Sequence, residues 1–149
     1  MANYVLMALA RLSPSLQVKN WLYRRMGIDV GDHVSVGLEA TMDVFFPELI
    51  SIGADSIVGF DSVILCHEFL ADEYRTGPVE IGEGVSIGAN VTILPGVEIG
   101  DGATVSAHSL VNCDVPAGAF YGGVPARPLD DADGGEPEEA GAFSGQDTR

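Results

Sequence analysis

The stretch IGEGVSIGANVTILPGVEIGDGAT, from Ile81 to Thr104, repeats one pattern every six residues. Each unit opens with an aliphatic residue, three of the four units follow it with glycine, and a small or β-branched residue stands four positions later. Neither the 3.6-residue period of a helix nor the two-residue period of a flat strand produces this spacing. A period of six indicates that each unit supplies a short strand and a turn, with the aliphatic side chain stacked inside a coil. The stretch therefore predicts a parallel β-helix.

The same period extends beyond this stretch in both directions. The aliphatic residues that open the units are Ile52, Val58, Ile64, Ile81, Ile87, Ile93, Ile99, Val105 and Val111. The small or β-branched residues are Val85, Val91, Val97, Ala103, Ser109 and Val115. Val30 and Val36 keep the register upstream, and it slips between Met42 and Ile52. We expect one all-β domain, a single-stranded coil of hexapeptide repeats, over residues 28–129.

One interruption of the repeat is informative. Ile64 and Ile81 are seventeen residues apart, which is not a multiple of six, so the segment CHEFLADEYRTGP (66–78) must leave the coil. A loop that leaves a rigid scaffold is a common place for functional residues. We expect the functional site at this loop.

The two ends of the chain differ from the repeats. Residues 1–27 predict an amphipathic helical segment in two pieces, with Ser13 as the cap of the second piece and with Val18, Trp21, Leu22 and Met26 sharing one face. Solenoids need a cap on their exposed end, so we expect this segment to cover the coil. Peripheral contact with an anionic membrane is the alternative use of a basic, apolar helix. Residues 130–149 are acidic and aperiodic, which predicts a disordered tail.

The charge of the chain excludes some partners. The formal net charge is −15 and Lys19 is the one lysine, so we exclude nucleic acid, whose phosphates need lysine and arginine on one face. An acidic surface poor in lysine is typical of a halophilic protein, and an ordinary acidic cytosolic protein is the alternative. Two cysteines and no signal-peptide pattern predict a reducing, cytoplasmic location.

Four motifs together resemble a known family. They are PELISIG (47–53), the loop LCHEFLADEYRTG (65–77), IGANVTILPGVEIGDGATV (87–105) and DVPAGAFYGGVPARPL (114–129). The chain resembles the hexapeptide-repeat (left-handed β-helix) acyltransferases, in the O-acetyltransferase branch of the maltose, galactoside and polysaccharide enzymes. The resemblance implies a left-handed coil, acetyl-CoA as acyl donor with no metal, a sugar or glycan hydroxyl as acceptor, and a homotrimer with active sites between neighbouring subunits.

The resemblance also implies that His67, which opens the loop, is the general base. A hydroxyl attacks a thioester poorly until a base accepts its proton, and a neutral imidazole can do this. A carboxylate could orient the ring, and Glu68, Asp72 and Glu73 are near in sequence. Spacing alone does not choose among these three acids.

Binding of coenzyme A is predicted at four positions. GGVPAR, which ends at Arg127, matches the family's C-terminal motif, whose basic residue lies near the nucleotide phosphates. By alignment along the repeats, Ala89, Ala107 and Asn112 match positions that line the pantetheine groove, largely through backbone groups.

Three other interpretations remain open at the level of sequence. A nucleophilic Cys66 activated by His67 is disfavoured because adjacent side chains of an extended segment point apart, and we expect Cys66 and Cys113 to be buried filler. A zinc enzyme of the β-helix carbonic anhydrase type would need His33, His67 and His108 to converge. A non-catalytic scaffold would need neither the histidine loop nor GGVPAR. The sequence does not identify the acceptor or separate O- from N-acetyl transfer.

Overall fold

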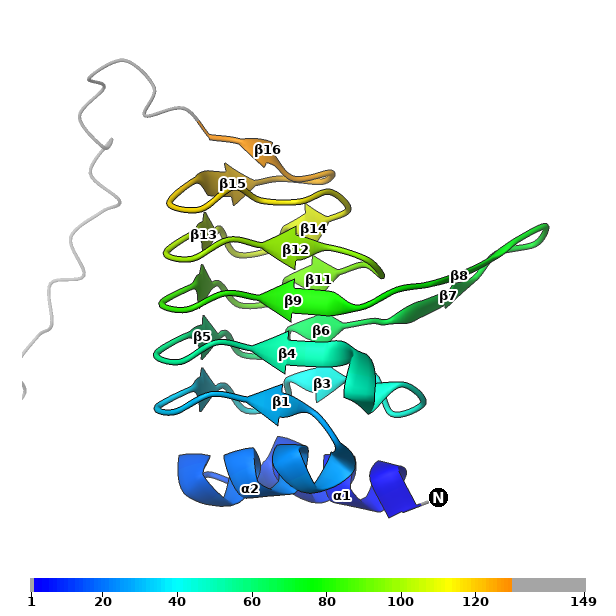
Figure 1. Ribbon diagram of the computed structural model, residues 1–149, viewed down its shortest axis with the longest axis vertical. Helices are drawn as coiled ribbons and strands as arrows, with labels where there is room; N and C mark the ends of the chain where they lie inside the picture. The colour runs from blue at the N-terminus through cyan, green and yellow to red at the C-terminus, as the bar shows by residue number, and fades with distance from the viewer. Residues whose placement is uncertain (1, 130–149) are drawn as a thin grey trace, which may run out of the picture.

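The computed structural model describes residues 2–129, in which two helices are followed by a stack of coils (Figure 1). The helices are α1 (Ala2–Leu12) and α2 (Leu16–Met26), and a short 3-10 helix, η1 (Pro47–Leu49), precedes β4. The strands are β1 (Asp29–Val30), β2 (Ser35–Val36), β3 (Thr41–Met42), β4 (Ile50–Ile52), β5 (Ile57–Val58), β6 (Val63–Ile64), β7 (His67–Phe69), β8 (Tyr74–Thr76), β9 (Val79–Ile81), β10 (Ser86–Ile87), β11 (Thr92–Ile93), β12 (Glu98–Ile99), β13 (Thr104–Val105), β14 (Leu110–Val111), β15 (Phe120–Gly122) and β16 (Arg127–Pro128). The tail predicted at 130–149 lies outside the described residues.

Three parallel sheets run along the stack, and each coil adds one strand to each sheet. Their orders are β1-β4-β9-β12, then β2-β5-β10-β13-β15, then β3-β6-β11-β14. The first coil is thus β1 to β3, the second β4 to β6, the third β9 to β11 and the fourth β12 to β14. β16 turns back antiparallel on β15 and ends the stack. The predicted β-helix is confirmed.

The six-residue period specifies the core. All nine aliphatic residues that open the repeats from Ile52 to Val111 are buried, with at most 3% of their surface exposed. They stack in register, as in the series Val58, Ile87 and Val105 across β5, β10 and β13. Each fully buried aliphatic side chain contributes about 1.5 to 3 kcal/mol through the hydrophobic effect. The coil is therefore held by a continuous apolar column.

Two kinds of glycine have different roles in the turns. A Cβ at Gly59 would lie 2.4 Å from the carbonyl carbon and oxygen of Gly88 in the next coil, so this glycine permits close stacking. Gly84 has φ +62 and nothing within 4 Å of its would-be Cβ, so it serves only a left-handed turn.

Substituting these two glycines by alanine should therefore have unequal effects. We expect Gly59→Ala to lower the free energy of unfolding by about 2 to 3 kcal/mol, because backbone must move. Gly84→Ala should cost about 1 kcal/mol from backbone strain alone. Urea denaturation at pH 7 measures both, and equal losses would contradict the difference in packing.

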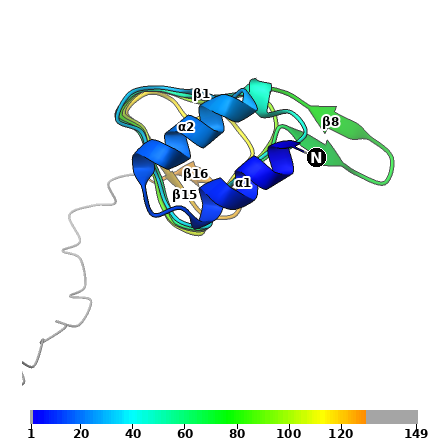
Figure 2. The same cartoon turned by 90° about the horizontal axis from the view of Figure 1, so that it is seen from below.

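Both helices lie across the open end of the first coil, as the view along the stack shows (Figure 2). The cap of α2 is Ser15, not the predicted Ser13: Ser15 Oγ accepts from Val18 N at 3.4 Å, and Gly27 ends the helix at φ 106. The apolar face predicted for this helix is only half buried. Leu22 and Met26 are buried, but Val18 and Trp21 are 47% and 59% exposed.

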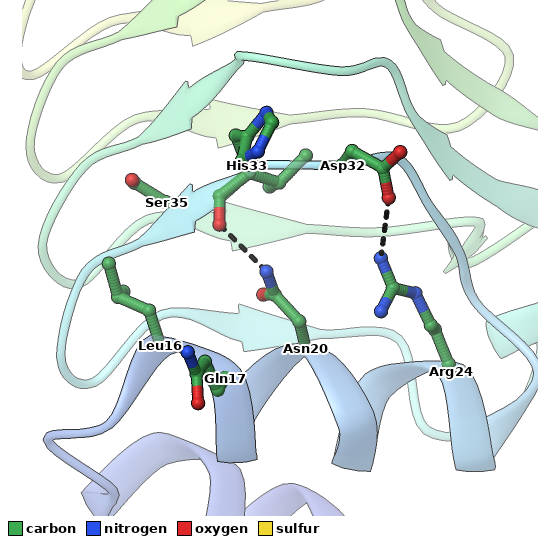
Figure 3. Close-up of a pocket in the computed structure, with 8 residues that line it drawn as sticks. Leu16, Gln17, Asn20, Arg24, Asp32, His33 and Ser35 are labelled. Atoms are coloured by element: carbon green, nitrogen blue, oxygen red, sulfur yellow. Dashed lines mark hydrogen bonds and ion pairs between the residues drawn. The ribbon is translucent and has the colours of Figure 1, made fainter.

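Polar side chains of α2, rather than Val18 and Trp21, face the coil. They do so because the edge of the first coil exposes backbone carbonyls. With no coil below it, its backbone carbonyls lack partners from a neighbouring strand. Lys19 Nζ donates to Gly37 O at 2.7 Å, Asn20 Nδ2 to Val34 O at 2.8 Å, and Arg24 Nε to Val30 O at 2.9 Å. Figure 3 shows Asn20 and Arg24 directed from α2 towards this coil. The helix caps the coil with hydrogen-bond donors as well as with apolar surface.

The outward face of the cap remains apolar. Tyr4, Val5, Leu9, Leu12 and Trp21 are each more than half exposed. No helix within residues 2–129 is long and apolar enough to cross a membrane. Peripheral contact of this face with a membrane stays a prediction, which cosedimentation with anionic vesicles would test.

Candidate active site

The predicted loop 66–78 is an ordered antiparallel hairpin of β7 and β8 that projects from one corner of the coil (Figure 1). Its base is closed at Cys66, whose carbonyl accepts from Gly77 N and Thr76 Oγ1, both at 3.0 Å. His67 is the first residue of β7. His67 therefore lies where the hairpin joins the coil.

The partner of His67 is Asp43, which no sequence argument had selected. Asp43 Oδ2 lies 2.5 Å from His67 Nδ1, and the aspartate side chain is fully buried while that of His67 is 16% exposed. Glu68 and Glu73 pair with Arg75 instead. The signal that could have found Asp43 is the register of the coils: Met42 pairs with Ile64, so the residue after Met42 lies beneath the root of the hairpin.

Asp43 is held as a carboxylate. Burial by itself would raise its pKa, but hydrogen bonds from Cys66 N, His67 and the amides of Phe45 and Phe46 outweigh burial and lower the pKa below the ordinary 3.8. An ionised carboxylate can only accept, so Nδ1 of His67 carries the proton that the pair shares. In the neutral imidazole, Nε2 then keeps a free lone pair. This is the tautomer that a general base requires.

Aromatic rings fix the orientation of the imidazole. The rings of Phe45 and Phe46 meet His67 edge-on, with centroids 5.3 and 5.5 Å away. Both phenylalanines belong to the turn in which the repeat register slips, between β3 and η1. The irregular turn therefore supplies the carboxylate and two of the rings that position His67.

The structure argues against Cys66 as a nucleophile. Its side chain is fully buried, and burial, together with the nearby Asp43 charge, raises the pKa of the Cys66 thiol to about 11. The thiolate is the reactive form, and it is scarce at neutral pH. Cys66 is buried filler, as predicted, whereas the same prediction for Cys113 was wrong, since Cys113 lies in an outer turn and is partly exposed.

The four candidate coenzyme residues form two pairs at different corners. Ala89 and Ala107 are stacked in the turns after β10 and β13, and the amide of His108 donates to Ala89 O at 2.9 Å. Arg127 and Asn112 meet at the next corner, where Arg127 Nη1 donates to Asn112 Oδ1 at 3.4 Å. His67 shares the Asn112 corner but lies two coils away. One chain does not bring His67 together with Ala89 and Ala107, because the sheet of β6, β11 and β14 separates their corners.

Both pairs suit parts of coenzyme A. The methyl side chains of Ala89 and Ala107 leave the backbone of their turns accessible to a narrow pantetheine arm, and Arg127 is exposed, as a phosphate contact requires.

The three histidines do not form a zinc site within one chain. His33 lies in the turn after β1, His67 in the hairpin and His108 in the turn after β13, so they occupy different corners and different coils. Across residues 2–129 the structure gathers no group of three histidine, cysteine or acidic side chains that could hold a metal ion. The histidine arrangement does not favour the carbonic anhydrase interpretation.

Comparisons with known proteins agree with this geometry. Residues 78–113 match the family described as bacterial transferase hexapeptide (six repeats). The chain is 52% identical over 126 residues to YvoF of Bacillus subtilis (strain 168), which carries the provisional name of an acetyltransferase; the match covers 84% of this chain and 73% of YvoF. A provisionally named acetyltransferase of Staphylococcus aureus (strain MSSA476) is 41% identical, over 83% of this chain and 77% of the relative.

Solved structures extend the likeness to the fold. A hexapeptide-repeat-containing acetyltransferase of Vibrio cholerae O1 biovar eltor, complexed with acetyl coenzyme A, superposes with a TM-score of 0.73 at 27% identity, over 86% of this chain and 84% of that one. A maltose O-acetyltransferase from Clostridium difficile 630 shares the fold with a TM-score of 0.66 at 22% identity, over 85% and 82% of the two chains. The repeats, the hairpin and these relatives lead to one conclusion: the chain belongs to the hexapeptide-repeat acetyltransferases.

Proposed function

We propose that this acetyltransferase moves the acetyl group of acetyl-CoA to a hydroxyl of a sugar or glycan, with His67 as general base. The observation that carries the proposal is the Asp43–His67 pair at the root of the hairpin, because a buried carboxylate leaves Nε2 of the imidazole able to accept a proton. A scaffold protein needs no such pair.

The chemical step follows from this arrangement. Nε2 of His67 accepts the hydroxyl proton while the acceptor oxygen attacks the thioester carbonyl. The carbon–sulfur bond then breaks, an ester forms, and the imidazolium returns the proton to the departing thiolate of coenzyme A. Asp43 stabilises the imidazolium in between, since its charge lies 2.5 Å from Nδ1.

We further propose that the enzyme is a homotrimer in which His67 of one chain serves the coenzyme groove of its neighbour. The support is the separation of His67 from Ala89 and Ala107 on different corners of one chain. Two free cysteines, in the described residues, support a reducing cytoplasm as the compartment.

Mixing two inactive variants tests the function and the assembly together. His67→Ala lacks the base, and Ala107→Trp fills the groove, so each variant alone should be inactive. After co-refolding, roughly a quarter of the sites in a random mixture would combine an intact base with an intact groove from another chain. Release of coenzyme A thiol, measured with an acceptor panel, should recover to roughly that fraction.

The controls separate the possible failures. A tag on one of the two variants reports exchange of subunits, because mixed oligomers captured through the tag contain the untagged variant. Isothermal titration with coenzyme A confirms that the groove of His67→Ala is intact. Exchange without recovery would place base and groove in the same chain. Absence of acetyl-CoA binding by wild type would refute the acetyl-transfer function.

A further inference from the structure

The two faces of the hairpin carry different kinds of side chain. In the β7–β8 ladder His67 lies opposite Thr76, and Phe69 lies opposite Tyr74. Because side chains alternate between the two faces of a strand, these four share one face. The pair between them, Glu68 and Arg75, lies on the other face, where the two charges are 3.9 Å apart. The face that carries the base is therefore free of charged side chains from the two strands.

Large aromatic rings on this face are left in solvent. Phe69 and Tyr74 are 77% and 48% exposed, and their ring centroids are 4.9 Å apart at an angle of 33°. Phe69 also contacts the His67 ring, with centroids 5.5 Å apart, and Phe45, 72% exposed, approaches His67 from the coil. Contiguous exposed apolar surface of this kind marks a binding site.

The charged residues around the hairpin limit the kind of ligand that can bind to its aromatic face. Arg75, the one basic residue of the hairpin, is held by Glu68 and Glu73. Elsewhere in residues 2–129 the cations lie in the cap helices or, as Arg127, near the other end of the stack. The nearby groups for which the chain provides a charge are acidic: Asp43 contacts His67, Glu48 acts electrostatically on Cys66 at the hairpin base, and Asp72 lies between β7 and β8. Within one chain, an anionic ligand at this surface would therefore meet repulsion without a compensating cation.

We propose that Phe69 and Tyr74, together with Phe45, form the acceptor subsite, and that it selects an uncharged saccharide. The apolar face of a sugar ring stacks on the aromatic platform, and one hydroxyl of that ring reaches Nε2 of His67. Phe69 and Tyr74 set specificity by binding the ring, while His67 performs the proton transfer. This inference rests on the proposed function, because it assigns the second substrate of the same site.

The test compares neutral and anionic acceptors in wild type and two hairpin variants. The acceptors are methyl glycosides of neutral hexoses and the corresponding methyl hexuronides. Phe69→Ala removes half of the platform, and Glu68→Gln is the matched control on the opposite face of the same strand. We expect wild type to acetylate the neutral glycosides at least tenfold more efficiently than the hexuronides. Phe69→Ala should raise KM for the glycoside by about 3- to 10-fold and leave KM for acetyl-CoA unchanged.

Several outcomes would overturn the subsite. They are equal use of the hexuronides, an unchanged glycoside KM in Phe69→Ala, or the same rise in Glu68→Gln. Sedimentation velocity detects a further possibility: if Phe69→Ala dissociates the oligomer and activity falls in proportion, the rings are a subunit contact. Phe69→Tyr should restore the glycoside KM. If wild type binds no acetyl-CoA, the proposed function itself is wrong, and the acceptor subsite is wrong with it. Acetyl-CoA binding by wild type therefore distinguishes this failure from a failure of the subsite alone.

Discussion

Replacing His67 with alanine should lower kcat for acetyl transfer by a factor on the order of 10² to 10⁴, the usual contribution of a positioned general base. KM for acetyl-CoA should stay the same, because the residues proposed to bind the coenzyme, Ala89, Ala107, Asn112 and Arg127, do not include His67. The rate is measured as release of coenzyme A thiol, and coenzyme binding by titration calorimetry. Imidazole added to the His67→Ala enzyme should recover part of the rate, because a free base can enter the space that the side chain leaves.

His33→Ala is the matched control for this substitution. His33 is a second histidine whose side chain is 83% exposed, at the cap end of the coil, so its loss should leave kcat within about twofold of wild type. If His67→Ala kept full activity, another group would have to accept the acceptor's proton, and the assignment of His67 would be wrong.

Replacing Asp43 with asparagine should impair both catalysis and stability. The amide NH2 would replace either Oδ1, which accepts from the Phe45 and Phe46 amides, or Oδ2, which accepts from Cys66 N and His67 Nδ1. Either orientation leaves buried backbone donors unsatisfied, and the second also favours the His67 tautomer with the proton on Nε2. We expect kcat to fall by a factor on the order of 10² or more, and the free energy of unfolding at pH 7 to fall by about 1 to 3 kcal/mol. Thiol release and urea denaturation measure the two effects. A variant that lost stability but kept full kcat would make Asp43 a structural residue only.

The stability effect of Asp43 should also depend on pH in a defined direction. Its pKa is lowered in the folded protein, so the carboxylate stabilises the fold above its ordinary pKa, and this contribution is lost as the pH falls through the lowered value. The part of the difference in unfolding free energy between wild type and Asp43→Asn that comes from the Asp43 charge should therefore shrink as the pH falls below about 4. Taking the difference removes the effect of the other acidic residues, which titrate in both proteins.

The sequence predicted the coil because one physical constraint acts at every sixth residue. Each aliphatic side chain must reach the axis of the coil, so the pattern persists from Ile52 to Val111 and needs no long-range information. The hairpin was predicted only as an interruption. Its order comes from pairing between β7 and β8, which the hexapeptide period does not describe.

A different physical reason explains why the sequence analysis did not find Asp43 or the buried polar residues of the cap. Asp43 and His67 are 24 positions apart and meet only through the stacking of consecutive coils, in the region where the repeat register slips. Lys19 and Asn20 were not among the residues predicted to share the apolar face of the second helix, yet both are buried. They are buried because they bind the row of backbone carbonyls on the first coil. The positions of backbone carbonyls cannot be predicted from the pattern of side chains in the sequence.

That row of acceptors also bears on how the protein avoids polymerising. A β-helix whose terminal coil were bare would present a ready template for the strands of another molecule, and chains could then add end to end into a fibre. Lys19, Asn20 and Arg24 occupy the carbonyls to which an incoming strand would bond. At the other end, the antiparallel return of β16 along β15 breaks the parallel register that a further coil would need. The length of the solenoid is thus limited at both ends by backbone hydrogen bonding, which keeps a stackable repeat a discrete molecule.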